Sequence, residues 1–221
     1  MVPYVNIHTH RPASQPTAAC ISVSSYRIGS GEMLPPAPFS AGIHPWDADA
    51  SYGCLSELPR MLRAFGAVAV GETGLDYSGM HRAVRHQREV FATQLRLAEE
   101  YRLPVIIHCV RAFEPVMELL SAHELPCVIF HGYTGSMQQT LRVERAGYCI
   151  SVGNASLGSP KTAASLRAFP AERLFIETDD SDTPIEAMYR RVSALLEVPL
   201  PELKERIFKN FKTVFPDYGV A

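Results

Sequence analysis

Two histidines near the start of the chain are spaced so that both could bind one metal ion. His8 and His10 close a short apolar run that begins at Tyr4 and alternates in the manner of a β-strand. Successive side chains of a strand point to opposite faces, so positions i and i+2 share a face. Neutral imidazoles placed side by side are good ligands for a divalent cation. The alternative interpretation is a pair of exposed or hydrogen-bonded histidines in an N-terminal strand.

Four further side chains that could bind a metal ion each follow a later apolar run. They are Glu72, His108, His131 and Asp179. Taken singly, each has a simpler role, because the carboxylates could cap helices and the histidines could be hydrogen-bonded core residues. Six such residues, each at the end of a strand, are too many to be a coincidence. The set therefore predicts a metal-dependent active site.

The apolar periodicity predicts the elements that must position these residues. Strands are expected at residues 4–10, 19–25, 39–43, 67–70, 104–107, 127–130, 148–152 and 174–176. Helices are expected at residues 55–65, 82–101, 112–122, 136–146, 160–168, 184–196 and 201–214. Thr183 is expected to cap the sixth helix, with Pro184 as its first residue. No helix-length pattern falls between residues 11 and 38.

Eight strands separated mostly by helices favour an α/β fold, the TIM (β/α)8 barrel. The missing patterns indicate that it is trimmed by loss of the helices after the first two strands. A doubly wound open sheet is the rival, but no G-x-G-x-x-G motif follows the first strand. A barrel places the carboxyl ends of all its strands on one rim, where the six candidate ligands would meet. No linker or repeat divides the chain, which indicates one domain over residues 1–221.

The composition is that of an ordinary globular protein. Of its 221 residues, 47% are hydrophobic and 20% are charged. The net charge of -2 gives no general attraction to nucleic acid or to a membrane surface, so a polyanion would need a local patch or metal ions. No apolar run is long enough to span a membrane, and no signal peptide is visible. Five cysteines without CxxC spacing indicate reduced thiols in a cytoplasmic protein.

Several motifs in chain order resemble those of the TatD family of metal-dependent hydrolases, within the amidohydrolase superfamily. The matching segments are HTH at 8–10, AGIHP at 41–45, GETGLDY at 71–77, LPVIIH at 103–108, VIFHGY at 128–133 and FIETD at 175–179, with Asn210 and Phe215 near the end. The resemblance implies a TIM barrel, a divalent-metal centre and hydrolysis of phosphodiesters. Deoxyribonuclease activity is described for the family.

The resemblance also implies a role for each of the six ligands. One ion would lie at His8, His10 and Asp179, a second at His108 and His131, and Glu72 would bridge the two. Two neighbouring cations need a shared anion to offset their repulsion. Glu72 and Asp179 are the expected catalytic carboxylates, and Asp179 could take a proton from the attacking water. The residue types suit two divalent ions, with Mg, Mn and Zn as the candidates.

Five other residues are candidates for contacts with the substrate. His44, in the GIHP segment, could orient a ligand or a substrate oxygen, or could be a loop histidine beside a tryptophan. Arg11 and Arg111 follow candidate ligands and could bind a phosphate, or could form ion pairs. Tyr77 and Tyr133 could line the pocket or stack on a base.

The chain departs from the family's pattern in ways that bear on the substrate. Asn6 stands where the family usually has Asp, and the loops after the first, second and eighth strands are short. A trimmed site should bind DNA weakly and act on DNA ends, short oligonucleotides or small phosphodiesters. The alternatives are a hydrolase of a small ester, lactone or amide, and a barrel that serves as an interaction scaffold. The sequence does not predict an oligomeric state.

Overall fold

The computed structural model describes residues 2–11, 19–79, 81, 84–216 and 218. The strands follow one another in the sheet in sequence order. They are β1 (Tyr4–Thr9), β2 (Cys20–Arg27), β3 (Phe39–Gly42), β4 (Ala69–Asp76), β5 (Val105–Val110), β6 (Val128–Phe130), β7 (Cys149–Val152) and β8 (Leu174–Ile176). A parallel bridge from Thr9 to Asp179 joins β1 to the residues after β8. Sequential order with the two ends joined is the strand arrangement of a TIM barrel.

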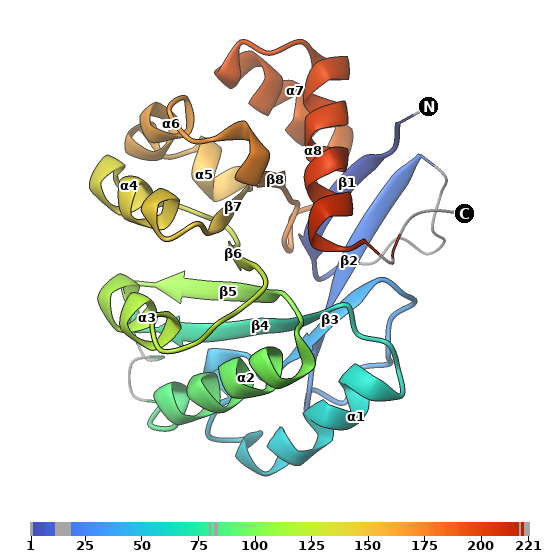
Figure 1. Cartoon of the computed structure of the whole chain (residues 1–221), viewed down its shortest axis with the longest axis vertical. Helices are drawn as coiled ribbons and strands as arrows, with labels where there is room; N and C mark the ends of the chain where they lie inside the picture. The colour runs from blue at the N-terminus through green and yellow to red at the C-terminus, as the bar shows by residue number, and fades with distance from the viewer. Residues whose placement is uncertain (1, 12–18, 80, 82–83, 217, 219–221) are drawn as a thin grey trace. The chain divides into compact units, whose positions relative to one another are not determined.

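The helices follow the third and later strands (Figure 1). They are α1 (Leu58–Arg63), α2 (Gln87–Tyr101), α3 (Phe113–Leu120), α4 (Met137–Arg145), α5 (Asn154–Leu157), α6 (Pro160–Leu166), α7 (Ile185–Leu196) and α8 (Leu200–Val214), with 3-10 turns η1 (Pro45–Asp47), η2 (Tyr52–Glu57) and η4 (Ala171–Arg173). As predicted, no helix lies between β2 and β3, and none lies in the described residues between β1 and β2. None of the described helices is long and apolar enough to cross a membrane.

The residues group into two compact units. Unit 1 consists of residues 1–24 and 130–221, and unit 2 consists of residues 25–129. That residues 1–221 form one domain stays a prediction.

In unit 2, β4 is longer than its sequence suggested. The glycines at 71 and 74 read as the end of a strand at Val70, yet β4 runs to Asp76 and all eight of its residues are buried. It pairs in parallel with β5, with Gly74 opposite His108, and β5 likewise continues past His108 to Val110. The glycines permit close approach of the neighbouring strand rather than a turn.

The helices of unit 2 begin and end differently from the prediction. The helix expected from Arg82 starts at Gln87, and Arg82 itself lies outside the described residues. Asp49 accepts hydrogen bonds from the backbone N–H groups of Arg85 and His86, which holds those two residues in a turn. The helix expected over 55–65 is divided into η2 and α1, so the expected apolar face is broken. Phe65 lies beyond the end of α1 and is 39% exposed.

In unit 1, α7 and α8 pack against β1. Tyr189 of α7 is fully buried, and its hydroxyl donates to the carbonyl of Val5 and accepts from the N–H of Val5, each at 3.0 Å. The expected N-cap of α7 was wrong. Pro184 is the N-cap, and the Thr183 hydroxyl instead hydrogen-bonds with Ser181 and Asn154.

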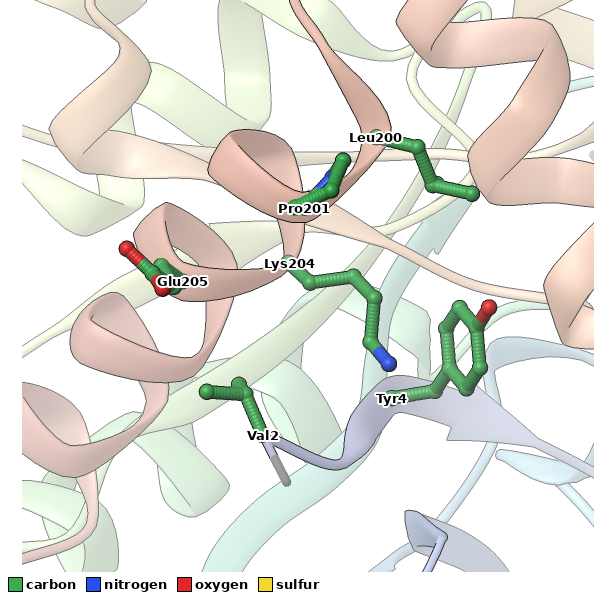
Figure 2. Close-up of a pocket in the computed structure, with 6 residues that line it drawn as sticks. All are labelled: Val2, Tyr4, Leu200, Pro201, Lys204 and Glu205. Atoms are coloured by element: carbon green, nitrogen blue, oxygen red, sulfur yellow. The ribbon is translucent and has the colours of Figure 1, made fainter.

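A cavity of about 370 Å³ opens on unit 1 at the start of β1. Its lining residues, drawn in Figure 2, are Val2, Tyr4, Leu200, Pro201, Lys204 and Glu205. The ammonium of Lys204 lies 3.8 Å from the centroid of the Tyr4 ring, a cation–π contact. Since Tyr4 begins the strand that carries the candidate ligand His8 near its other end, this cavity is separate from the predicted metal site.

The close approach of β4 to β5 gives a test of what holds His108 in place. A Cβ atom added at Gly74 would lie 2.0 Å from the carbonyl oxygen of His108, and Gly74 has φ of 143°. We expect Gly74→Ala to lower the free energy of unfolding by about 3 kcal/mol or more, through overpacking and backbone strain. Gly53→Ala, where nothing lies within 4 Å, is the matched control. Equal urea midpoints for the two variants would contradict the strand contact.

Candidate metal centre

In unit 1, the backbone fixes Asp179 between His8 and His10. The N–H of Asp179 donates to the carbonyl of His8 at 3.1 Å, and the N–H of His10 donates to the carbonyl of Asp179 at 3.0 Å. The carboxylate oxygen Oδ1 then lies 3.6 Å from His8 Nε2 and 3.5 Å from His10 Nε2. Both imidazoles thus face one carboxylate, as the i, i+2 spacing on a strand predicts.

His131 joins this cluster from the end of β6. Its ring centroid lies 4.3 Å from that of His8. One donor atom each from His8, His131 and Asp179 lies within 4.8 Å of the others. Imidazole nitrogens and a carboxylate oxygen converging in this way form a donor set suited to a divalent metal ion.

Glu177 lies next to the Nδ1 atom of His131. Its side chain is fully buried, and Oε1 lies 3.5 Å from His131 Nδ1. Oε1 also accepts from the N–H of Gly132 at 2.6 Å, and Oε2 accepts from the hydroxyl of Ser151. A carboxylate held by donors in this way can orient the ring of a metal-binding histidine. Glu177 was not predicted as a site residue, although it directly follows an apolar strand, as Glu72 was expected to do.

Asn6, which stands where the family usually has Asp, makes two hydrogen bonds to Thr178. Its amide donates to Thr178 Oγ1 at 2.8 Å, and its carbonyl oxygen accepts from the N–H of Thr178 at 3.0 Å. A carboxylate at this position could accept but not donate. The amide therefore ties β1 to the segment that carries Asp179.

In unit 2, Glu72 is buried and lies between two imidazoles. Its Oε1 is 2.7 Å from His108 Nδ1 and 3.1 Å from His44 Nε2. These three residues form a second group whose donor atoms lie within 4.8 Å of one another. The geometry also suits a divalent ion, since a carboxylate and two imidazole nitrogens are brought together out of water.

Asp76 supports His108 from the other side of the ring. Its Oδ2 lies 3.1 Å from His108 Nε2 and accepts from the indole N–H of Trp46 at 2.7 Å. Burial alone would raise the pKa of Asp76, but hydrogen bonds from His108, Ser78 and Trp46 outweigh it and hold that pKa well below its usual range. Asp76 is therefore an anion that can accept a hydrogen bond from the Nε2–H group of His108, which leaves Nδ1 to act as a ligand.

His44 is oriented by its neighbours. Its Nδ1 accepts from the N–H of Trp46 at 3.2 Å, so Nε2 carries the proton when the ring is neutral and donates it to Glu72. Burial lowers the pKa of His44, and the hydrogen bond to Glu72 offsets only part of that effect. These contacts support the predicted role of His44 in orienting Glu72.

The other predicted substrate contacts lie in different surroundings. Arg11 is exposed and forms an ion pair with Asp182, and Arg111 is exposed with φ of 52°. Tyr133 is 5% exposed, and its hydroxyl hydrogen-bonds with Thr140 at 3.1 Å, which leaves little of the ring for a base. Tyr77 is half-buried beside Arg88 of α2.

Asp76 was not predicted as a site residue, although it lies within the GETGLDY segment. A signal was present in the sequence, because residues 72, 74 and 76 of an extended strand share one face, as Glu72 and Asp76 do here. Because the strand was predicted to end at Val70, the shared face of Glu72 and Asp76 was not recognised. Burial raises the pKa of the Cys109 thiol, next to His108, to about 12, so we expect this thiol to be unreactive.

Comparison with known proteins identifies the family. A family model described as TatD-related DNase matches residues 32–216. The chain belongs to that family. It is 32% identical over 207 residues to the Escherichia coli K12 protein named "Uncharacterized metal-dependent hydrolase YjjV", covering 85% of this chain and 80% of YjjV. The predicted family is thereby confirmed.

A second relative carries a more specific name. The chain is 33% identical over 147 residues to the "3'-5' ssDNA/RNA exonuclease TatD" of Pectobacterium parmentieri. That match covers 63% of this chain, and the chain spans only 56% of the exonuclease's length.

Solved structures confirm the predicted fold. The crystal structure of E. coli YjjV, a TatD homologue, has a TM-score of 0.75 at 27% identity and covers 88% of this chain and 86% of that one. A TatD-family hydrolase from Entamoeba histolytica also has a TM-score of 0.75, at 16% identity, over 96% of this chain and 98% of its own. Both comparisons support the TIM-barrel class.

The contacts of Asp76 predict an effect on metal affinity that is separable from folding. We expect Asp76→Asn to weaken binding of Mn²⁺ or Zn²⁺ by about 10- to 100-fold, because a neutral amide orients His108 less strongly than a carboxylate does. Isothermal titration calorimetry measures the change. The control is Asp49→Asn, which alters an exposed aspartate 2.7 Å from His86 Nδ1 and should leave metal affinity as in the wild type. Identical affinities for the two variants would show that Asp76 does not support a ligand.

Proposed function

We propose that the protein is a metal-dependent hydrolase of phosphodiesters that acts on DNA ends or short oligonucleotides. The observation that carries the proposal is the pair of converging donor groups, His8, His131 and Asp179 in unit 1 and His44, Glu72 and His108 in unit 2. Membership of the TatD-related DNase family and the names of the two relatives support the same chemistry. We also propose a cytoplasmic location, which suits the reduced thiols expected from the spacing of the cysteines.

The donor chemistry of both groups fits divalent cations. We propose that one ion binds His8, His10 and Asp179 and that a second binds Glu72 and His108, with His44 orienting Glu72 and with Mg, Mn and Zn as the candidates. Such an ion, when bound, lowers the pKa of a water molecule and offsets negative charge on the phosphate. The pairing of His108 with His131, and the bridging role of Glu72, join residues of both units and stay predictions.

Asp179 is the residue best placed to accept a proton from the attacking water. Its side chain is 39% exposed, and its Oδ1 faces two imidazoles. The hydrogen bonds from its backbone to His8 and His10 hold that oxygen in place before substrate arrives. A base held in position in this way contributes without having to reorganise during the reaction.

Removing the charge of Glu72 tests the proposal directly. We expect Glu72→Gln to lower hydrolysis of a short single-stranded oligonucleotide at least about 100-fold, because the carboxylate that lies between His44 and His108 loses its charge. Chelation should abolish the activity of the wild-type protein, and added Mn²⁺, Mg²⁺ or Zn²⁺ should restore it. Thermal melting should show that the variant remains folded.

Glu89→Gln is the matched control for this change. It alters an exposed carboxylate on α2 that hydrogen-bonds with Tyr52, and its activity should equal that of the wild type. Full activity of Glu72→Gln would overturn the assignment of Glu72. Hydrolysis of an ester, lactone or amide in the same assay, with none of any phosphodiester, would favour the small-molecule alternative.

Weak binding of DNA predicts a shallow dependence on salt. Arg11 is paired with Asp182 and Arg27 with Asp47, so these arginines contribute little free positive charge. We expect about one to three phosphate contacts, which gives a slope of about -0.7 to -2 for log affinity against log salt with single-stranded DNA. Fluorescence anisotropy of a labelled oligonucleotide measures this slope. Steeply salt-dependent cutting of a closed circular duplex would contradict it.

A further inference from the structure

Trp46 is the only tryptophan of the chain, and it is partly exposed beside the unit 2 cluster. The residue belongs to η1, directly after β3, and 43% of its surface is accessible. His81 stacks flat on the indole, with ring centroids 4.3 Å apart and an interplanar angle of 11°. One part of the ring is thus covered by a second flat ring, and a large part faces solvent.

The position of the indole is fixed by hydrogen bonding. Its N–H donates to Asp76 Oδ2 at 2.7 Å, and the same oxygen lies 3.1 Å from His108 Nε2. The His44 ring packs nearly perpendicular to the indole, with an interplanar angle of 79° and centroids 4.7 Å apart. A group that contacts Trp46 would therefore lie next to two residues of the candidate metal cluster.

The surroundings of Trp46 favour an aromatic ligand over a phosphate. Arg27 lies over the indole, with its guanidinium carbon 5.9 Å from the ring centroid. Its Nε donates to the Asp47 carboxylate at 3.0 Å, so its charge is already neutralised. An exposed, immobilised indole offers a flat apolar surface, on which nucleobases stack irrespective of sequence.

We propose that Trp46, backed by His81, is a base-stacking subsite that positions a nucleotide of the substrate next to the cluster of His44, Glu72 and His108. This inference rests on the proposed function and adds the part of the substrate that is recognised. A simple structural role for Trp46, covering His44, would not require 43% of the residue to remain exposed.

The single tryptophan gives a direct optical test. The probes are a short phosphorothioate oligothymidylate and an abasic oligomer with the same backbone and length, each titrated into the metal-loaded protein. We expect the oligothymidylate to quench the fluorescence of Trp46 at saturation and the abasic oligomer to leave it nearly unchanged. Equal quenching by both oligomers, or by neither, would overturn the proposal.

Variants separate stacking from effects that pass through Asp76. We expect Trp46→Ala to reduce the preference for the base-bearing over the abasic oligomer by about 5- to 100-fold, measured by anisotropy. Trp46→Phe also loses the hydrogen bond to Asp76 but keeps a flat ring, so most of the preference should remain. If Phe behaves as Ala does, the effect comes from Asp76 and the proposal is wrong. Phe65→Ala, which removes an exposed aromatic ring elsewhere in unit 2, should retain the full preference.

The outcome distinguishes this inference from the proposed function. If the wild-type protein hydrolyses unmodified single-stranded DNA but shows no preference for bases, the subsite is wrong and the hydrolase assignment stands. If it binds oligothymidylate with quenching but hydrolyses no phosphodiester with any metal, the subsite stands and the proposed reaction fails.

Discussion

The candidate site depends on the cost of burying carboxylates. Glu72, Asp76 and Glu177 are each 2% exposed or less. Removing a carboxylate from water costs several kcal/mol unless hydrogen-bond donors or cations replace the lost hydration. Imidazoles, an indole N–H, hydroxyls and backbone N–H groups surround these three residues. The same donors that make the burial tolerable also fix the rings of His44, His108 and His131, so stability and orientation of the site have one cause.

The backbone is arranged to permit these contacts. Gly74 allows β4 to approach the carbonyl of His108 more closely than any residue with a Cβ could. Asn6 and Thr178 exchange two hydrogen bonds that hold the segment after β8 against β1. Neither Gly74 nor the pair of Asn6 and Thr178 is a candidate ligand. Each positions the backbone of one, Gly74 that of His108 and the pair that of Asp179.

The sequence predicted the parts of the site that follow from the alternation of side chains along a strand or from the position where an apolar strand ends. His8 and His10 share a face because of a two-residue spacing, and the buried run Leu174–Ile176 located Asp179. Prediction failed where glycine is compatible with either a turn or a closely packed strand. Gly71 and Gly74 were interpreted as part of a turn, so the strand was predicted to end at Val70. That Glu72 and Asp76 share one face of the strand was therefore missed. It failed again at Thr183 and Phe65, where tertiary contacts and a 3-10 turn overrode local capping and helical periodicity.

The bridge between Thr9 and Asp179 has a consequence for how the protein is made. Those two residues are 170 positions apart, and unit 1 is assembled from the first and last parts of the chain. During synthesis, His8 and His10 are made before the carboxylate that they face, which is added 170 positions after Thr9. A nascent chain that stops before Asp179 therefore carries two imidazoles without their anionic partner, and the unit 1 cluster can form only after Asp179 has been made.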